Sequence, residues 1–335
     1  MNSTFAPSKK SSTLLASHVV GFSISFQSDH ALARGMGLEH LRELLTRLAR
    51  PLLSHGASVA YGGNWKLGDD NFTYKLLDLI NAERQEQTLA GTDEGPLLGK
   101  LINHSAWPDY LDISPKTEAE WIHCCHIIRV TQAMADIKPS LILPDGANDK
   151  TLPQLLLNRS RTLSAMRRLA TTGVTIQTDG LPRVSHVPAL RARVVLGGKL
   201  ARYEGFMPGV LEEASLALEH GVPLYILGGF GGAAEVLAKS LLGPAGTVHD
   251  ELSAEWHLAT VEGLQPLNAA GKKARLPASE LTDGRFARLK RQLSAVRRNL
   301  GRLGTRLPKP ELIELMTTSN PRRAVELTLK GILGR

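Results

Sequence analysis

Short segments of β-branched and apolar residues alternate with amphipathic helical segments, and this alternation restricts the chain to few folds. The segments HVVGFSI at 18–24 and ASVAY at 57–61 have the composition of buried parallel strands. Between them, leucines recur at intervals of three and four residues from Leu38 to Leu52, which places one apolar stripe on a helix. A strand, a helix and a second strand in this order form a βαβ unit.

The same alternation continues along the chain. It predicts an α/β fold with a Rossmann-like, mostly parallel sheet and helices on both of its faces. Further helices are expected at 71–84, 118–137, 161–173, 208–221 and 233–242. Further strands are expected at 100–107, 140–146, 191–199 and 222–232. The strand pattern then ends, which predicts a helical C-terminal annex over about 250–335. Residues 1–17 are expected to be a disordered leader. Residues 18–335, annex included, are expected to form one ligand-binding domain.

Charge and composition indicate which classes of binding partner to expect. The 335 residues carry a formal net charge of +8, which favours anionic partners such as phosphates. No apolar run approaches the roughly 18 residues that a membrane-spanning helix needs, so no membrane partner is expected. The only two cysteines are the neighbours Cys124 and Cys125, which we interpret as small buried residues on a helix. They offer no disulfide framework, and this fits a cytoplasmic protein.

Glycine-rich turns follow three of the expected strands: YGGN at 61–64, VLGGK at 195–199 and YILGGFGG at 225–232. The carboxyl ends of parallel strands lie along one edge of the sheet, where ligands of such folds bind. Without a Cβ atom, glycine lets a phosphate approach the backbone N–H groups and the start of the next helix. The alternative is that glycine pairs only end the strands and allow close helix packing. No G-x-x-x-x-G-K-[ST] motif is present, which excludes a P-loop NTPase.

Two glutamates open the helix expected at 208–221. Pro208 suits a first helical turn, and Glu212 and Glu213 fall near the same edge of the sheet. A carboxylate there can accept hydrogen bonds from a ribose diol or act as a general base on an N-glycosidic bond. The alternative is that both carboxylates only stabilise the helix N-terminus. Lys199 is the expected phosphate partner.

Several of these segments together resemble the SLOG superfamily, which includes the LOG-type phosphoribohydrolases, the DprA proteins and the sensor region of TRPM channels. The nearest likeness is to a prokaryotic branch associated with TIR domains and antiphage defence. The resemblance is carried by VGFSIS at 20–25, SVAYGGN at 58–64, RARVVLGGK at 191–199, YEGFMPGVLEEASLAL at 203–218, VPLYILGGFGGAAEVL at 222–237 and the helical ending at 310–333.

The resemblance implies a sensor for a nucleotide-derived ligand, such as an NAD or ADP-ribose derivative or a cyclic oligonucleotide, acting in antiphage signalling with a separate TIR-like effector. In the enzyme branch, a P-G-G-x-G-T-x-E-E turn and an upstream arginine cleave nucleotides. MPGVLEE at 207–213 keeps the Pro-Gly and both glutamates but lacks the extra glycines and the threonine, which favours binding. The alternative is an N-glycosidic hydrolase with Glu212, Glu213 and Arg167 as catalytic residues, where Arg168 could replace Arg167.

The expected ligand-binding residues lie in the glycine turns, the first strand and the first turn of the helix at 208–221. They are Gly21, Ser23, Gly62, Gly63, Asn64, Gly197, Gly198, Lys199, Pro208, Gly209, Glu212, Glu213, Gly228, Gly229, Phe230, Gly231 and Gly232.

Two other features of the sequence bear on metal and nucleic-acid binding. His123 and His126 flank the cysteines, but no second ligand pair of matching spacing follows, so no metal and no required cofactor are expected. The stretch 285–306 holds eight basic residues and no acidic one, which is typical of a solvated helix face or of a surface for a polyanion. It has only one aromatic residue, so nucleic acid is not an expected partner. We expect a homo-oligomer.

Overall fold

The computed structural model describes residues 14–27, 35–66, 68, 71–89, 100–147, 152–177, 184–244, 247 and 249–334. Most of the expected leader, up to residue 13, lies outside the described residues. Leu15 is buried, and its amide donates a hydrogen bond to the carbonyl of His55 at 3.0 Å.

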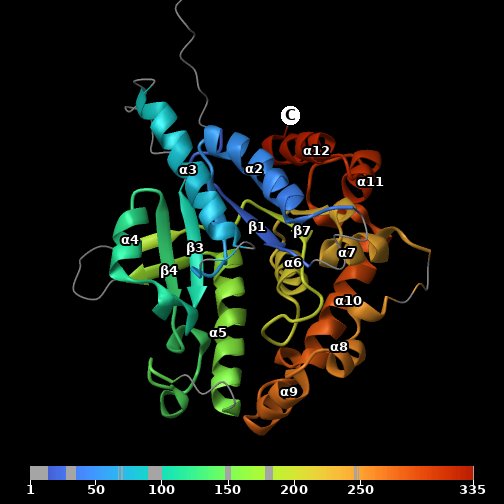
Figure 1. Ribbon diagram of the computed structural model, residues 1–335. Coiled ribbons are helices and arrows are strands. Elements are labelled where there is room, and N and C mark those ends of the chain that lie inside the picture. Colours follow the sequence, from blue (N-terminus) through green and yellow to red (C-terminus); the bar gives the residue numbers. More distant parts are fainter. Residues whose placement is uncertain are drawn as a thin grey trace, which may run out of the picture.

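The sheet has six parallel strands in the order β4-β3-β2-β1-β7-β8, which confirms the Rossmann-like α/β fold (Figure 1). The strands are β1 (Val19–Ser25), β2 (Ser58–Tyr61), β3 (Leu101–Ala106), β4 (Cys125–Val130), β7 (Ala192–Gly197) and β8 (Leu224–Leu227). The order runs outward from β1 in both directions, so the chain reverses its direction of winding beside the first strand. Ligands of open α/β sheets bind at such a point.

Helices cover both faces of the sheet (Figure 1). One face packs against α2 (Leu38–Ser54), α3 (Phe72–Leu89) and α12 (Pro321–Leu333), while α11 (Lys309–Thr317) beside β8 contributes to the core on both faces. The other packs against α5 (Pro153–Thr172), α6 (Gly209–Glu219), α7 (Gly232–Leu242) and α10 (Thr282–Arg298). The short helices α8 (Ala254–Thr260) and α9 (Leu264–Lys273) complete the expected helical annex, and a small apolar cluster joins α9 to α5.

Helix α2 shows why the leucine spacing matters. Leu41, Leu44, Leu45, Leu48 and Leu52 are all buried against the sheet. Each buried leucine side chain stabilises the fold by about 1.5–3 kcal/mol relative to an exposed one. The helical periodicity of this segment therefore fixes both the helix and the face that it buries.

The prediction of one helix over 118–137 is wrong. Helix α4 (Pro115–Trp121) is short and is capped by the Ser114 hydroxyl, which accepts a hydrogen bond from the Thr117 amide. The chain then forms strand β4, and both cysteines are buried, with Cys125 in the strand and not in a helix. β4 pairs with β3 along its whole length, and this long-range pairing outweighs the local helical pattern.

The prediction of a strand over 140–146 is also wrong. Residues Pro139–Leu141 form a single 3₁₀ turn, and Leu141 and Ile142 are exposed. Pro139 and Pro144 lack the N–H groups that a central strand would use. A pair that the sequence did not predict, β5 (Val174–Gln177) and β6 (Val184–Val187), forms a small antiparallel sheet after α5.

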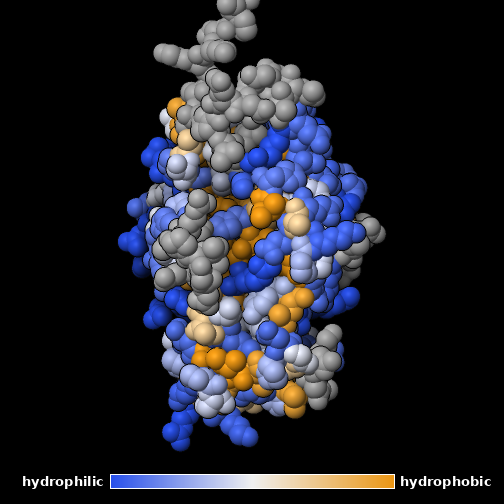
Figure 2. Space-filling model, turned by 90° about the vertical axis from the view of Figure 1, so that its left-hand side faces the viewer, coloured by the Kyte–Doolittle hydropathy of each residue, from blue (hydrophilic) through white to orange (hydrophobic). Residues whose placement is uncertain are grey.

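Among the described helices, none combines the length and apolar character needed to cross a lipid bilayer. Figure 2 shows the face at the left of Figure 1, where hydrophobic areas are interrupted by hydrophilic side chains.

Gly232 offers a test of how closely β7 and α7 must approach. Its φ is +66°, and an added Cβ would lie 2.6 Å from the backbone of Gly197 and Gly198. Gly221 has nearly the same φ, +65°, but open space around it. We expect Gly221→Ala to lower the free energy of unfolding by about 1 kcal/mol, from backbone strain alone. Gly232→Ala should cost about 1–3 kcal/mol more, since it adds overlap with backbone.

Urea unfolding of both variants at one temperature measures this difference. Equal losses in the two variants would contradict the close packing of α7 on the end of β7.

Candidate functional site

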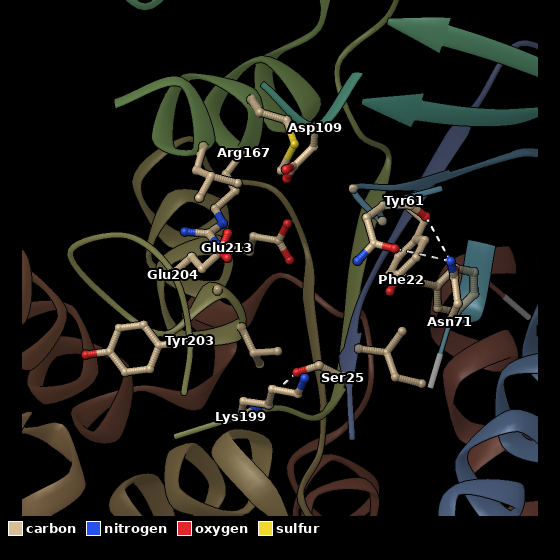
Figure 3. A pocket seen from close by; sticks show the side chains of 18 of the residues that line it. Phe22, Ser25, Tyr61, Asn71, Asp109, Arg167, Lys199, Tyr203, Glu204 and Glu213 are labelled. Atoms are coloured by element: carbon tan, nitrogen blue, oxygen red, sulfur yellow. Dashed lines mark hydrogen bonds between the residues drawn. The ribbon is translucent and has the colours of Figure 1, made fainter. Parts of the chain in front are cut away.

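A cavity of about 420 Å³ lies at the carboxyl ends of β1, β2 and β7. Ser25 lines it from the end of β1, Gly62 and Asn64 from the turn after β2, and Lys199 from the turn after β7 (Figure 3). The strand order reverses between β2 and β7 on either side of β1, so the cavity lies at the topological switch point of the sheet.

Two helices form the opposite wall of the cavity. Leu163, Met166 and Arg167 line it from α5, and Gly209 and Glu213 line it from the first turns of α6. In Figure 3 the labelled Arg167, Glu213, Glu204 and Tyr203 lie on one side, and Tyr61, Phe22 and Asn71 on the other. The cavity thus has a polar, charged side and a partly aromatic side.

A buried asparagine on β3 positions the turn after β2. Asn103 is fully buried, and its side-chain nitrogen donates to the carbonyls of Tyr61 at 3.2 Å and Gly63 at 3.0 Å. Its side-chain oxygen accepts a hydrogen bond from the Trp65 indole at 2.9 Å. An added Cβ on Gly63 would lie 2.4 Å from the Thr73 hydroxyl, so the tight turn needs glycine there. Sequence reasoning missed Asn103, although the run of three polar residues Asn103, His104 and Ser105 within a strand was a visible signal.

The two neighbouring glutamates of α6 have different environments. The Glu213 carboxylate lines the cavity, and one of its oxygens lies 3.3 Å from the Arg193 guanidinium. Glu212 does not line this cavity. Its two oxygens accept hydrogen bonds from Arg167 and from Arg285 of α10. Burial by itself raises the pKa of Glu212, but Arg285 and Arg167 outweigh it and hold the pKa below its ordinary value.

Arg193 on β7 holds the Glu213 carboxylate that lines the cavity. It is completely buried and donates to the hydroxyls of Ser23 and Thr171, each at 2.9 Å, in addition to its pairing with Glu213. A buried guanidinium requires such partners because an uncompensated charge is costly. Sequence reasoning missed Arg193, and its signal was a single charge inside an otherwise apolar strand.

Arg167 reaches Glu212 across the first turn of α6. An added Cβ on Gly209 would lie 3.0 Å from its guanidinium, so glycine leaves room for this approach. Neighbouring Pro208 is buried at the N-cap position of α6 and does not line the cavity.

Further charged side chains surround the opening. Arg159 lies 3.0 Å from Asp109 and 2.7 Å from Glu204, so its charge is compensated. Arg202 is exposed, has a left-handed backbone with φ of +53°, and has no ion pair with the described residues. Non-glycine residues with positive φ are uncommon and occur often at functional sites.

The structure brings together only part of the predicted site. The predicted residues that line the cavity are Gly62, Gly63, Asn64, Lys199, Gly209, Glu213 and Arg167. Those that do not line it are Gly21, Ser23, Gly197, Gly198, Pro208, Glu212, Gly228, Gly229, Phe230, Gly231 and Gly232. An added Cβ on Gly228 or Gly229 would meet the backbone of Met316 or Thr318, because the end of α11 closes over the end of β8.

The histidines considered for metal binding lie apart from the cavity. The His123 ring contacts the Asn81 side-chain oxygen at 3.1 Å and stacks on Trp121, while His126 lies in β4. Within the part of the chain that the structure describes, no cluster of three or more suitable side chains could hold a metal ion.

His104 on β3 is a buried titratable group near this network. Neither ring nitrogen has a hydrogen-bond partner. Burial and the neighbouring charges of Arg193 and His126 lower its pKa from 6.5 to about 3, so the ring is neutral in the folded protein at neutral pH.

The chain belongs to the SLOG family, since the family model described as SLOG cluster2 matches residues 14–284. The match includes every residue named above as lining the cavity and ends one residue before Arg285. No curated protein matches the sequence at a significant level.

His104 predicts a specific dependence of stability on pH. In the unfolded chain the ring gains a proton below about pH 6.5, whereas in the folded protein it stays neutral down to about pH 3. Stability from this group is therefore complete above pH 6.5 and falls by about 1.4 kcal/mol per pH unit on acidification between these values. We expect His104→Leu to flatten the pH dependence measured by urea unfolding between pH 6.5 and 4.5. The exposed His220→Leu should keep the wild-type slope, because the buried ring is unchanged.

Glu212 predicts a large stability effect. At pH 7, Glu212→Gln should lower the free energy of unfolding by about 3–5 kcal/mol, since two buried guanidiniums lose their counter-charge. The exposed Glu255→Gln is the control and should change it by less than about 0.5 kcal/mol. Because the folded pKa of Glu212 is depressed, its stabilisation is present above the unfolded value of 4.5 and is lost as pH falls through the folded value. A Glu212→Gln variant as stable as the control at pH 7 would contradict this role.

Proposed function

We propose that this SLOG family member binds a nucleotide-derived ligand that carries phosphate, such as an NAD or ADP-ribose derivative or a cyclic oligonucleotide. The observation that supports it best is the cavity at the switch point, where Lys199, Glu213 and the turn at Gly62 and Gly63 face one space. A cation and the start of a helix favour phosphate, and a carboxylate accepts hydrogen bonds from ribose hydroxyls.

Each part of the cavity suits one part of such a ligand. Lys199 and Arg202 line the same cavity as Gly209 at the start of α6, so charge and the helix dipole would both stabilise an anionic phosphate there. The Glu213 carboxylate, backed by Arg193, suits a sugar diol. Tyr61, which is half-buried, supplies aromatic surface on the opposite side for a base.

We favour binding over turnover because of Glu212. Both of its oxygens are held by guanidiniums and it does not line the cavity, which leaves Glu213 as the one carboxylate of the expected pair that faces a ligand there. The alternative, cleavage of an N-glycosidic bond, draws on Arg167 and Glu213, which line the same cavity. In that case Glu213 would act as the general base.

The role in signalling is the finer part of the proposal. It comes from the resemblance to proteins associated with TIR domains, and it makes this chain a cytoplasmic sensor that reports its ligand to a separate effector protein in antiphage defence. Both cysteines are buried free thiols, which suits a reducing compartment. The expected homo-oligomer belongs to the same proposal.

Calorimetric titration of the full chain with ADP-ribose, NAD and AMP tests the binding. We expect at least one of them to bind, and Lys199→Gln and Glu213→Gln each to weaken binding by about tenfold, the loss of one charge-assisted hydrogen bond. Lys272→Gln, an exposed charge on α9, is the control and should bind as the wild type does. Circular dichroism confirms that each variant is folded.

Binding that is unchanged in both cavity variants would contradict the site. In a parallel incubation, released base is measured by chromatography. Turnover that is lost in Glu213→Gln and kept in the control would replace the binding proposal with the hydrolase alternative.

A further inference from the structure

A second cavity, of about 350 Å³, lies between α5, α6 and α10 and is lined by arginine side chains. Its four arginines are Arg161 and Arg168 of α5 and Arg285 and Arg288 of α10. It shares no lining residue with the first cavity. The two are separated by the Arg167–Glu212 pair, in which Arg167 lines the first cavity and Glu212 lines the second.

The spacing along each helix explains why the arginines converge. Arg161 and Arg168 are two turns apart on α5, with the small residues Ser164 and Ala165 between them on the same face. Arg285 and Arg288 are one turn apart on α10, which packs beside α6. The small residues Ser164 and Ala165 leave space beside α5, and both arginine pairs line this one hollow.

The ion pairs around this cavity leave an excess of positive charge. Within the described part of the chain, the Arg161 guanidinium donates only to the backbone carbonyls of Ala135 at 3.1 Å and Asp136 at 3.0 Å, and neither carbonyl neutralises it. Arg168 has one distant partner, the exposed carboxylate of Asp136 at 3.8 Å. Both guanidiniums thus keep unused N–H donors.

The other arginines are more strongly held. Arg288 pairs with Glu219 at 3.0 Å, while Arg285 shares Glu212 with Arg167. Glu280 is the remaining carboxylate on the cavity wall. The four lining arginines and Arg167, which shares Glu212, are set against four carboxylates: the lining Asp136, Glu212 and Glu280, and Glu219, the partner of Arg288. One positive charge is left in excess.

We propose that this second cavity binds a compact polyvalent phosphate of the pyrophosphate class. A guanidinium presents N–H groups in a planar fork that matches phosphate oxygens, and several forks around one hollow suit two linked phosphates better than one. A cavity of this size is within the range of small-ligand sites. The site is separate from the one proposed for the nucleotide-derived ligand and does not depend on it.

Calorimetric titration of the full chain with inorganic pyrophosphate, at fixed ionic strength and without divalent cations, tests this proposal. We expect saturable binding that the double variant Arg161→Gln with Arg168→Gln weakens by about tenfold or more. The matched control is Lys290→Gln with Arg291→Gln, which removes the same charge from exposed positions of α10 that line neither cavity. The control should bind within about twofold of the wild type, because surface charges at a distance are screened.

Three results would overturn the proposal: no binding at millimolar pyrophosphate, an equal loss in the control variant, or a loss caused by Lys199→Gln, which would place the anion in the first cavity. Should the double variant not fold by circular dichroism, the single Arg168→Gln serves instead. Its only ion pair with a described residue is at 3.8 Å and exposed, so the fold does not depend on it. It should weaken pyrophosphate binding several-fold, and unchanged binding would count against the site.

Discussion

Buried guanidiniums hold the two adjacent glutamates of α6, Glu212 and Glu213, in place, and the shape of the candidate site depends on this. Arg193 reaches Glu213 from β7, while Arg167 and Arg285 reach Glu212 from α5 and α10. Removing one partner of a buried ion pair typically costs about 3–5 kcal/mol, because the other charge stays buried without compensation. These pairs join the sheet, two covering helices and the C-terminal annex, so the wall of the cavity is built by elements distant in sequence.

Two adjacent residues of one helix thereby obtain different chemistry. Successive positions on a helix point about a quarter-turn or more apart, so Glu213 faces the cavity while Glu212 turns toward α5 and α10. The first is available to a ligand and the second neutralises arginines. The Arg167–Glu212 pair also separates the two cavities: the first is lined by a glycine turn and strand ends, and the second by four arginines. The proposed nucleotide site and the proposed pyrophosphate site are therefore distinct in composition as well as in place.

The three glycine turns also differ from one another. One faces a possible ligand, whereas glycines in the other two permit close packing. The turn at Gly62 and Gly63 lines the cavity, which is the arrangement that a ligand-binding turn requires. Gly232 lies against the backbone of Gly197 and Gly198, and Gly229 lies against Thr318, so these glycines permit close packing. The difference follows from strand position. The switch point is open between β2, β1 and β7, whereas β8 is at the edge and α11 covers its end.

The alternation of apolar strands and amphipathic helices by itself determined the α/β class, the strands β1, β2, β3, β7 and β8, and the helical C-terminal annex, because periodicity and β-branching are local properties. Local pattern failed at β4, where pairing with β3 outweighed a helical sequence, and at 140–146, where prolines deny a strand its donors. It also could not distinguish Glu212 from Glu213 or give roles to Asn103 and Arg193. Those assignments depend on which side chains meet across the sheet, and only the tertiary structure brings such distant residues into contact.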